Sequence, residues 1–162
     1  MHRWRRLATL LLTVIATAVI AAAQLEAQQT LRANVLRPLQ FNAVSGGITS
    51  AGSLHAPSDT GAFEVIGRAG ARVEVWFNLP ATFNGPRGEV VPVTFDATSA
   101  AYSAAQTPVD GQRFDPRLRQ TFTVPSTGRF LIYLAGRVAV HAAQLPGRYH
   151  AQVVLFANEV PW

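Results

Sequence analysis

Short runs in which apolar and polar residues alternate are the main pattern along this chain of 162 residues. Glycine or proline separates these runs about every eight to twelve residues, and apolar residues at helical spacing are few. Alternation with a period of two places apolar side chains on one face of a strand. We therefore predict an all-β fold, an immunoglobulin-like antiparallel β-sandwich.

Residues 62–80, AFEVIGRAGARVEVWFNLP, predict a hairpin. Phe63 and Val65 share one face of the first strand, and Gly67 and Gly70 form the turn. The second strand alternates apolar and polar residues, which indicates one buried face and one solvent-facing face. Trp76 falls on the polar face, so it is our candidate for a partner surface. The alternative is that a neighbouring loop covers it.

The stretch 144–156, QLPGRYHAQVVLF, predicts a second, closing hairpin. Pro146 and Gly147 fit the two central positions of a type II turn. Tyr149 then lies on the apolar face of the following strand. Its ring is expected to be buried and its hydroxyl to bond a backbone acceptor, as in a tyrosine corner.

His141 and His150 flank this turn almost symmetrically, so antiparallel pairing would place them opposite each other or one diagonal step apart. Two imidazoles at that distance are candidate ligands for zinc or copper, but a closed site needs a third and a fourth ligand. No carboxylate or cysteine occurs between residues 128 and 158. We therefore interpret both histidines as solvent-facing residues and predict no metal site.

Residues 96–119 are rich in Ala, Ser, Thr, Gln, Pro and Asp. They predict a long surface loop, which is uncommon in a compact domain and hence a candidate functional element. Its aspartates match no calcium-binding spacing.

The N-terminus has the layout of a secretory signal peptide over residues 1–23: three arginines, an apolar run and small residues before Gln24. Cleavage after Ala27 is the second choice, and a retained membrane anchor is the alternative, although 17 apolar residues are marginal for a span. Residues 24–35 then form an N-terminal segment with the first strand, and residues 36–158 form one sandwich domain. No stable membrane span is expected after cleavage.

Composition and charge narrow the function. The formal charge of +5 falls to +2 without the signal, and the remaining arginines are scattered, so no nucleic-acid surface is expected. Cysteine is absent, so burial and backbone pairing must hold the domain. The acidic residues are isolated from one another and no G-x-S-x-G motif occurs. We therefore expect no enzymatic activity, no catalytic residues and no cofactor.

Four stretches in order, LQFNAV, GGITSAGS, AFEVIGRAGARVEVWFNLP and FLIYLAGRVAVHAAQLPGRYHAQVVLF, resemble the domain of unknown function 4402 family over residues 36–157. Asn42, Ala135 and Ala151 depart from its pattern. The resemblance implies a secreted bacterial domain of fimbrial or pilin-like type, with no established catalytic residues to carry over.

Together these observations predict a secreted structural or surface-interaction domain, located in the periplasm or at the cell surface. A fimbrial subunit assembled by β-strand addition is one alternative, and a periplasmic binder of a metal or small ligand is another. Partners would be other envelope or pilus proteins that contact open sheet edges.

Overall fold

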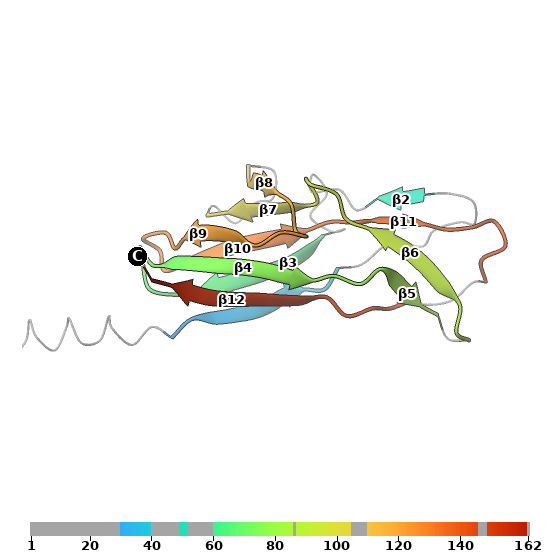
Figure 1. Cartoon of the computed structure of the whole chain (residues 1–162), viewed down its shortest axis with the longest axis horizontal. Helices are drawn as coiled ribbons and strands as arrows, with labels where there is room; N and C mark the ends of the chain where they lie inside the picture. Colours follow the sequence, from blue (N-terminus) through green and yellow to red (C-terminus); the bar gives the residue numbers. More distant parts are fainter. Residues whose placement is uncertain are drawn as a thin grey trace, which may run out of the picture. The chain divides into compact units, whose positions relative to one another are not determined.

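The computed structural model describes residues 30–39, 49–51, 60–85, 87–104, 110–145 and 149–161. The predicted signal peptide, Pro146 and Gly147 lie outside these residues. Residues Leu31–Trp162 make one compact unit. Its described strands are β1 (Arg32–Arg37), β2 (Thr49–Ala51), β3 (Gly61–Ile66), β4 (Arg72–Asn78), β5 (Thr82–Asn84), β6 (Val90–Thr94), β7 (Ala100–Ser103), β8 (Gln112–Phe114), β9 (Gln120–Thr123), β10 (Arg129–Leu134), β11 (Arg137–Ala139) and β12 (Val154–Val160) (Figure 1).

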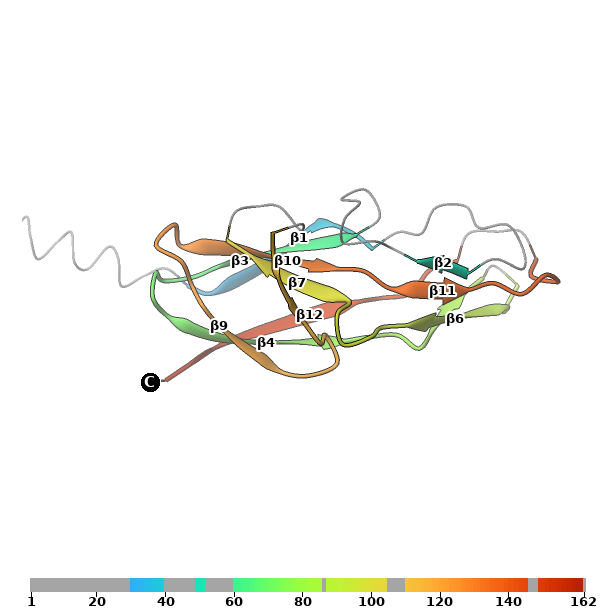
Figure 2. The same ribbon diagram turned by 90° about the horizontal axis from the view of Figure 1, so that it is seen from above.

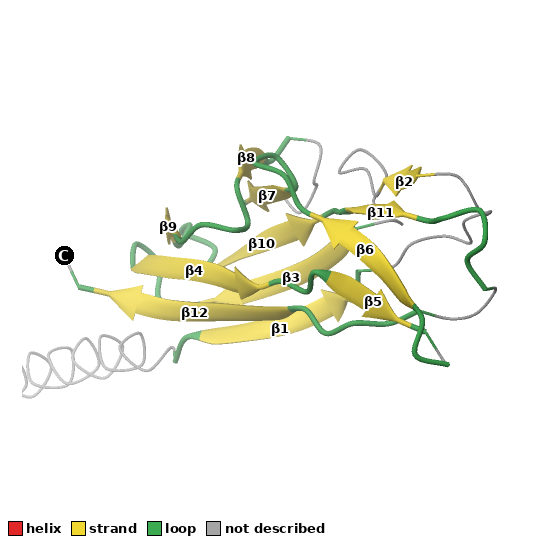
Figure 3. Cartoon of the chain, turned by 45° about the vertical axis from the view of Figure 1, so that its right-hand side comes forward, coloured by secondary structure: helices red, strands yellow, loops and turns green. Residues whose placement is uncertain are grey.

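The strands form antiparallel sheets, and the described residues contain no helix. One sheet has the order β1-β3-β10-β7-β8 and another the order β12-β4-β9. Figure 2 shows these two as the layers of a sandwich, with β3, β10 and β7 in one layer and β4, β9 and β12 in the other. A further sheet, β2-β11-β6-β5, continues the fold beyond them (Figure 3). The predicted all-β sandwich is confirmed.

Alternation of side chains builds the core between the layers. Val65 on β3 and Ile132 on β10 meet Val73 and Val75 on β4 in one apolar cluster, and all four are completely buried. The polar residues between them point outward, so β4 alternates as the sequence predicts. Each buried Val or Ile side chain contributes about 1.5–3 kcal/mol through the hydrophobic effect.

The predicted hairpin over residues 62–80 is wrong in its pairing. β3 bonds β1 and β10, whereas β4 bonds β12 and β9. The turn is present, because the amide of Ala71 donates to the carbonyl of Arg68 at 3.0 Å. It carries the chain from one layer to the other instead of back along the same sheet. Alternation of apolar and polar residues identifies the buried face of a strand. The pattern does not show whether the next strand in the sequence pairs with it in the same sheet or faces it across the core.

A second connection between the layers, from β9 to β10, lies against this turn. The amide of Gly67 donates to the carbonyl of Gly128 at 3.0 Å, and the amide of Gly70 donates to that of Val124 at 2.9 Å. The amide of Val124 in turn donates to the carbonyl of Ala71 at 2.9 Å. The two crossings are thus tied to each other by backbone hydrogen bonds.

The predicted closing hairpin is also wrong in its pairing. β11, which precedes the predicted turn, bonds β2 and β6. β12, which follows it, bonds β4 in an unbroken register from Val154 opposite Asn78 to Val160 opposite Arg72. The two strands therefore belong to different sheets.

The prediction of a long loop over residues 96–119 also has to be corrected, because this stretch contains β7 and β8. Ala100 and Ala101 are completely buried, one in each of two apolar clusters on the opposite faces of the sheet. Alanine is small and favours strands weakly, so the composition of this stretch suggested a loop. Burial on both faces explains why small residues occupy these positions.

β1 crosses the expected boundary at residue 36, and the compact unit starts at Leu31. The side chain of Leu31 packs against the main core, which fixes the start of the strand.

Aromatic rings close one side of the sandwich, where β7 and β8 face β9. The ring of Tyr102 stacks on that of Phe122 with centroids 4.6 Å apart, and Phe122 meets Phe114 edge to face at 5.2 Å. The Tyr102 hydroxyl donates to the carbonyl of Thr123 at 3.3 Å, which joins the two layers. Burial raises the pKa of Tyr102.

We predict that Gly70→Ala lowers the free energy of unfolding by about 1 kcal/mol, because the φ angle of Gly70 is +78° and side chains are strained there. A Cβ at this position would meet no atom within 4 Å, so strain is the only cost. Urea unfolding measures the change. Gly70→Asn is the control and should lose less, since asparagine tolerates this conformation. Equal stability of Gly70→Ala and the parent would contradict the prediction.

Candidate interaction surface

The outward face of the β12-β4-β9 sheet carries a row of three side chains, one from each strand or its margin. Trp76 lies on β4, Phe156 lies directly opposite it on β12, and Arg119 immediately precedes β9. The Trp76 and Phe156 rings are parallel within 9°, with centroids 5.3 Å apart. The Arg119 guanidinium carbon lies over the Trp76 ring, 4.1 Å from its centroid.

The two neighbours contact Trp76 from opposite sides, because β4 lies between β12 and β9. Parallel rings at 5.3 Å are offset-stacked, and the guanidinium makes a cation–π contact with the other face. Neither face of the Trp76 ring is therefore open for a ligand. The far face of Phe156, directed beyond β12, has no described ring stacked on it.

An ion pair positions the arginine of this row. Arg119 Nη1 lies 2.6 Å from Glu74 Oε2, and Glu74 is two residues from Trp76 on the same face of β4. An exposed pair of this kind contributes about 0.2–1 kcal/mol. Its main effect is to hold the guanidinium over the indole.

Apolar side chains are exposed along the side of the sandwich formed by β1 and β12. Val35 and Leu36 on β1 and Phe156 on β12 are exposed, with Val35 at 64% and Phe156 at 41%. β1 and β12 are the end strands of their sheets. Parts of them approach within 8 Å between Cα atoms, and no backbone ladder joins them in the described part of the chain (Figure 3).

Val35 is unusual because its register places it on the core side of its sheet. It pairs with Phe63, and Ala33 pairs with Val65, both buried residues of β3. A side chain on that face would ordinarily be covered by the opposite layer. The sandwich is thus closed by aromatic rings at β7 to β9 and exposes apolar side chains at β1 and β12.

Trp76 is the only residue of this surface that we singled out from the sequence. It is half-buried and lies on the outward face as predicted. Its cover comes from the side chain of Phe156 on β12 and from that of Arg119, in the connection that leads into β9. Those two residues and Val35 were missed, although Phe156 stands in the outward-facing set of its own alternation.

The expected pairing of His141 with His150 is wrong. His150 forms an isolated bridge with Asn84, its amide donating to the Asn84 carbonyl at 3.0 Å and its carbonyl accepting from the Asn84 amide at 2.9 Å. His141 lies two residues beyond the end of β11, and both side chains are exposed. The two strands expected to pair belong to different sheets, so nothing aligns the imidazoles.

Tyr149 makes the hydrogen bond expected of it. Its hydroxyl donates to the carbonyl of Leu145 at 2.7 Å and accepts from Gln144 Nε2 at 2.6 Å. The ring is half-buried against the core and lies on Gly85, where a Cβ would come within 2.6 Å of Tyr149 Cε1. Gly85 is therefore fixed by close approach of a ring, and this cluster is structural.

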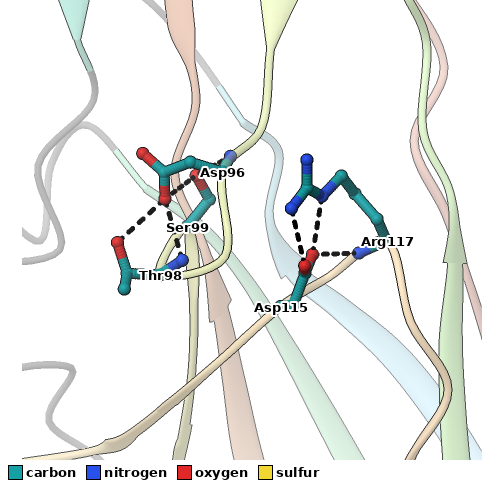
Figure 4. Close-up of polar contacts among 5 residues, drawn as sticks. All are labelled: Asp96, Thr98, Ser99, Asp115 and Arg117. Atoms are coloured by element: carbon teal, nitrogen blue, oxygen red, sulfur yellow. Dashed lines mark hydrogen bonds and ion pairs between the residues drawn. The ribbon is translucent and has the colours of Figure 1, made fainter.

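Two aspartates of the predicted loop, Asp96 and Asp115, are bound within their own turns (Figure 4). Asp96 Oδ1 accepts from the amide and the hydroxyl of Thr98, each at 2.8 Å, and from the Ser99 hydroxyl at 3.1 Å. Asp115 accepts from the guanidinium of Arg117 at 2.7 and 2.9 Å and from its amide at 2.9 Å. These bonds stabilise the ionised carboxyls, so the pKa of each lies below its ordinary value.

Within the described residues, no three His, Asp or Glu side chains gather as metal ligands would. The same residues include no helix with the length and hydropathy to cross a membrane.

Comparison with known proteins adds no assignment: no protein-family model matches the chain, and no curated protein matches it.

We predict an acid-dependent loss of stability from Asp96 and Asp115. A carboxyl whose pKa is lowered by folding stabilises the fold fully above its ordinary pKa of 3.8, and this stabilisation disappears as the pH falls from there through the lower folded pKa. Asp96→Asn and Asp115→Asn should each reduce the loss of stability per pH unit below pH 3.8. Thermal unfolding between neutral and acidic pH measures it, and Asp110→Asn, at an exposed aspartate of the same stretch, is the control. Unchanged slopes in both variants would contradict the prediction.

Proposed function

We propose that this protein is a secreted cell-envelope domain with a structural or surface-interaction role and no enzymatic activity. The observation that carries the proposal is the exposed apolar side of β1 and β12, where Val35, Leu36 and Phe156 meet solvent. Apolar side chains gathered at open strand edges are typical of protein-binding surfaces.

The charged groups support this reading. Four of the described ion pairs, Arg68–Glu159, Arg117–Asp115, Arg119–Glu74 and Arg129–Glu64, are contacts between or within the strands and turns of the fold. The acidic partners are therefore engaged in holding the fold. The signal-peptide layout and the resemblance to the 4402 family support a location in the periplasm or at the cell surface.

The proposal predicts that cells export the chain and that its β1 side binds envelope material. Mass spectrometry of the exported protein should show a start at Gln24 or Gln28. Val35→Lys should weaken binding of the purified protein to isolated envelopes of the source cell at least tenfold. The control is Val90→Lys, which changes another exposed valine on β6. An unprocessed cytoplasmic chain, or equal binding by both variants, would overturn the proposal.

A fimbrial subunit joined by strand addition is the second candidate. The observation that favours it is Val35, a core-facing side chain that stays exposed and that no described strand of the opposite layer covers. Residues 32–37, however, already pair with β3 as β1, so they are not a spare donor strand. The donor would have to come from another protein or from residues before β1.

Electron microscopy of the exported protein separates the two candidates. A fimbrial subunit should give regular fibres when it is produced together with its envelope partners, and Val35→Lys should abolish them. Dispersed particles under these conditions would contradict the fimbrial candidate.

A further inference from the structure

We propose that β12 pairs with β12 of a second copy of this chain, in an antiparallel two-fold arrangement centred on Phe156. This inference names a partner for the open edge on which the proposed function rests. It would join the two β12-β4-β9 sheets into one continuous sheet of six strands.

The edge of β12 lacks the features that normally prevent strands from pairing. Its register with β4 is unbroken over seven residues, without a bulge. It contains no proline and a single charged residue, Glu159, which is engaged by Arg68 at 2.9 Å. Long, regular edges with little charge readily pair with a further strand.

The stacked row determines which strand fits. Across the sheet, Arg119 stacks on Trp76 and Trp76 stacks on Phe156, so each strand or its margin contributes one side chain to the row. The face of the Phe156 ring that points away from Trp76 is the uncovered end of this row. A strand added to β12 places one side chain directly opposite Phe156. A second copy centred there presents its own Phe156, so the two rings stack and the rows become one.

The charge of β12 is compatible with this register. Centring on Phe156 puts Asn158 opposite Val154 of the other copy, and Glu159 opposite Val153. No like charges are placed opposite each other, and each Glu159 keeps Arg68 as its partner. In this register each residue of β12 pairs with a residue that lies on the same face of β12 in the other copy. The outward faces of the two sheets therefore lie on the same side of the joined sheet.

The neighbouring strand adds apolar surface to this contact. Val35 and Leu36 of β1 are exposed on the side to which β12 presents its edge. A partner strand on β12 would bring these residues close to the second copy and remove them from water. A two-fold interface of this kind is closed, so it yields dimers and no fibres.

Cysteine cross-linking tests both the pairing and its register, because the chain has no cysteine of its own. Directly opposed residues in an antiparallel pair have Cα atoms about 4.5–5.5 Å apart, within disulfide range. Val154→Cys combined with Asn158→Cys keeps Phe156 and places the cysteines of the two copies opposite each other, so this double variant should form a disulfide-linked dimer on mild oxidation. Asn158→Cys alone is the control, because its two copies would be about 14 Å apart and should stay unlinked.

Sedimentation of the cysteine-free exported protein gives the second readout. We expect a dimer that dissociates on dilution, and a monomer for Phe156→Lys, which puts two like charges opposite each other. Circular dichroism checks that this variant is folded, and Val90→Lys should remain dimeric. A parent that is monomeric at high concentration, or equal cross-linking of the double variant and of Asn158→Cys alone, would overturn the inference. Envelope binding is measured separately, so its loss or retention bears on the proposed function alone.

Discussion

The fold depends on two places where the chain crosses from one layer of the sandwich to the other. The connections β3 to β4 and β9 to β10 are hydrogen-bonded to each other through Gly67, Gly70, Ala71 and Val124. Because the chain has no cysteine, these backbone bonds and the buried core perform the cross-linking that disulfides perform in many exported domains. Four strands are placed by these crossings. β1, β7, β8 and β12 extend the same two sheets, and β2, β11, β6 and β5 form the further sheet.

The two sides of the sandwich differ in how they are completed. At β7 to β9, the rings of Tyr102, Phe114 and Phe122 interlock and the Tyr102 hydroxyl joins the layers. At β1 and β12, the core-facing Val35 is exposed and the stacked row on the outer sheet ends at Phe156. Because of this asymmetry, we expect association at the side of β1 and β12. The side of β7 to β9 is closed by its own aromatic rings.

Much of the fold was predictable from the sequence, but the pairing of strands was not. Alternation correctly identified the buried residues Val73 and Val75 and the outward position of Trp76. It misplaced the partners of β3, β11 and β12, since a period of two is the same for neighbouring and for facing strands. The stretch with Ala100 and Ala101 was missed because small buried residues resemble loop composition. The row on Trp76 depends on the register of three distant segments, and local patterns do not encode that register.

The placement of the first and last strands has a mechanical consequence. Arg32 pairs with Ile66 and Val160 pairs with Arg72, and the single turn of residues 67–71 joins those two partners. The start of β1 and the end of β12 therefore lie at the same end of the sandwich. Tension applied between these two points would peel the outer strands away one hydrogen bond at a time, whereas force along paired strands would load many bonds at once. A domain pulled through these two points would therefore unfold from its outer strands inward.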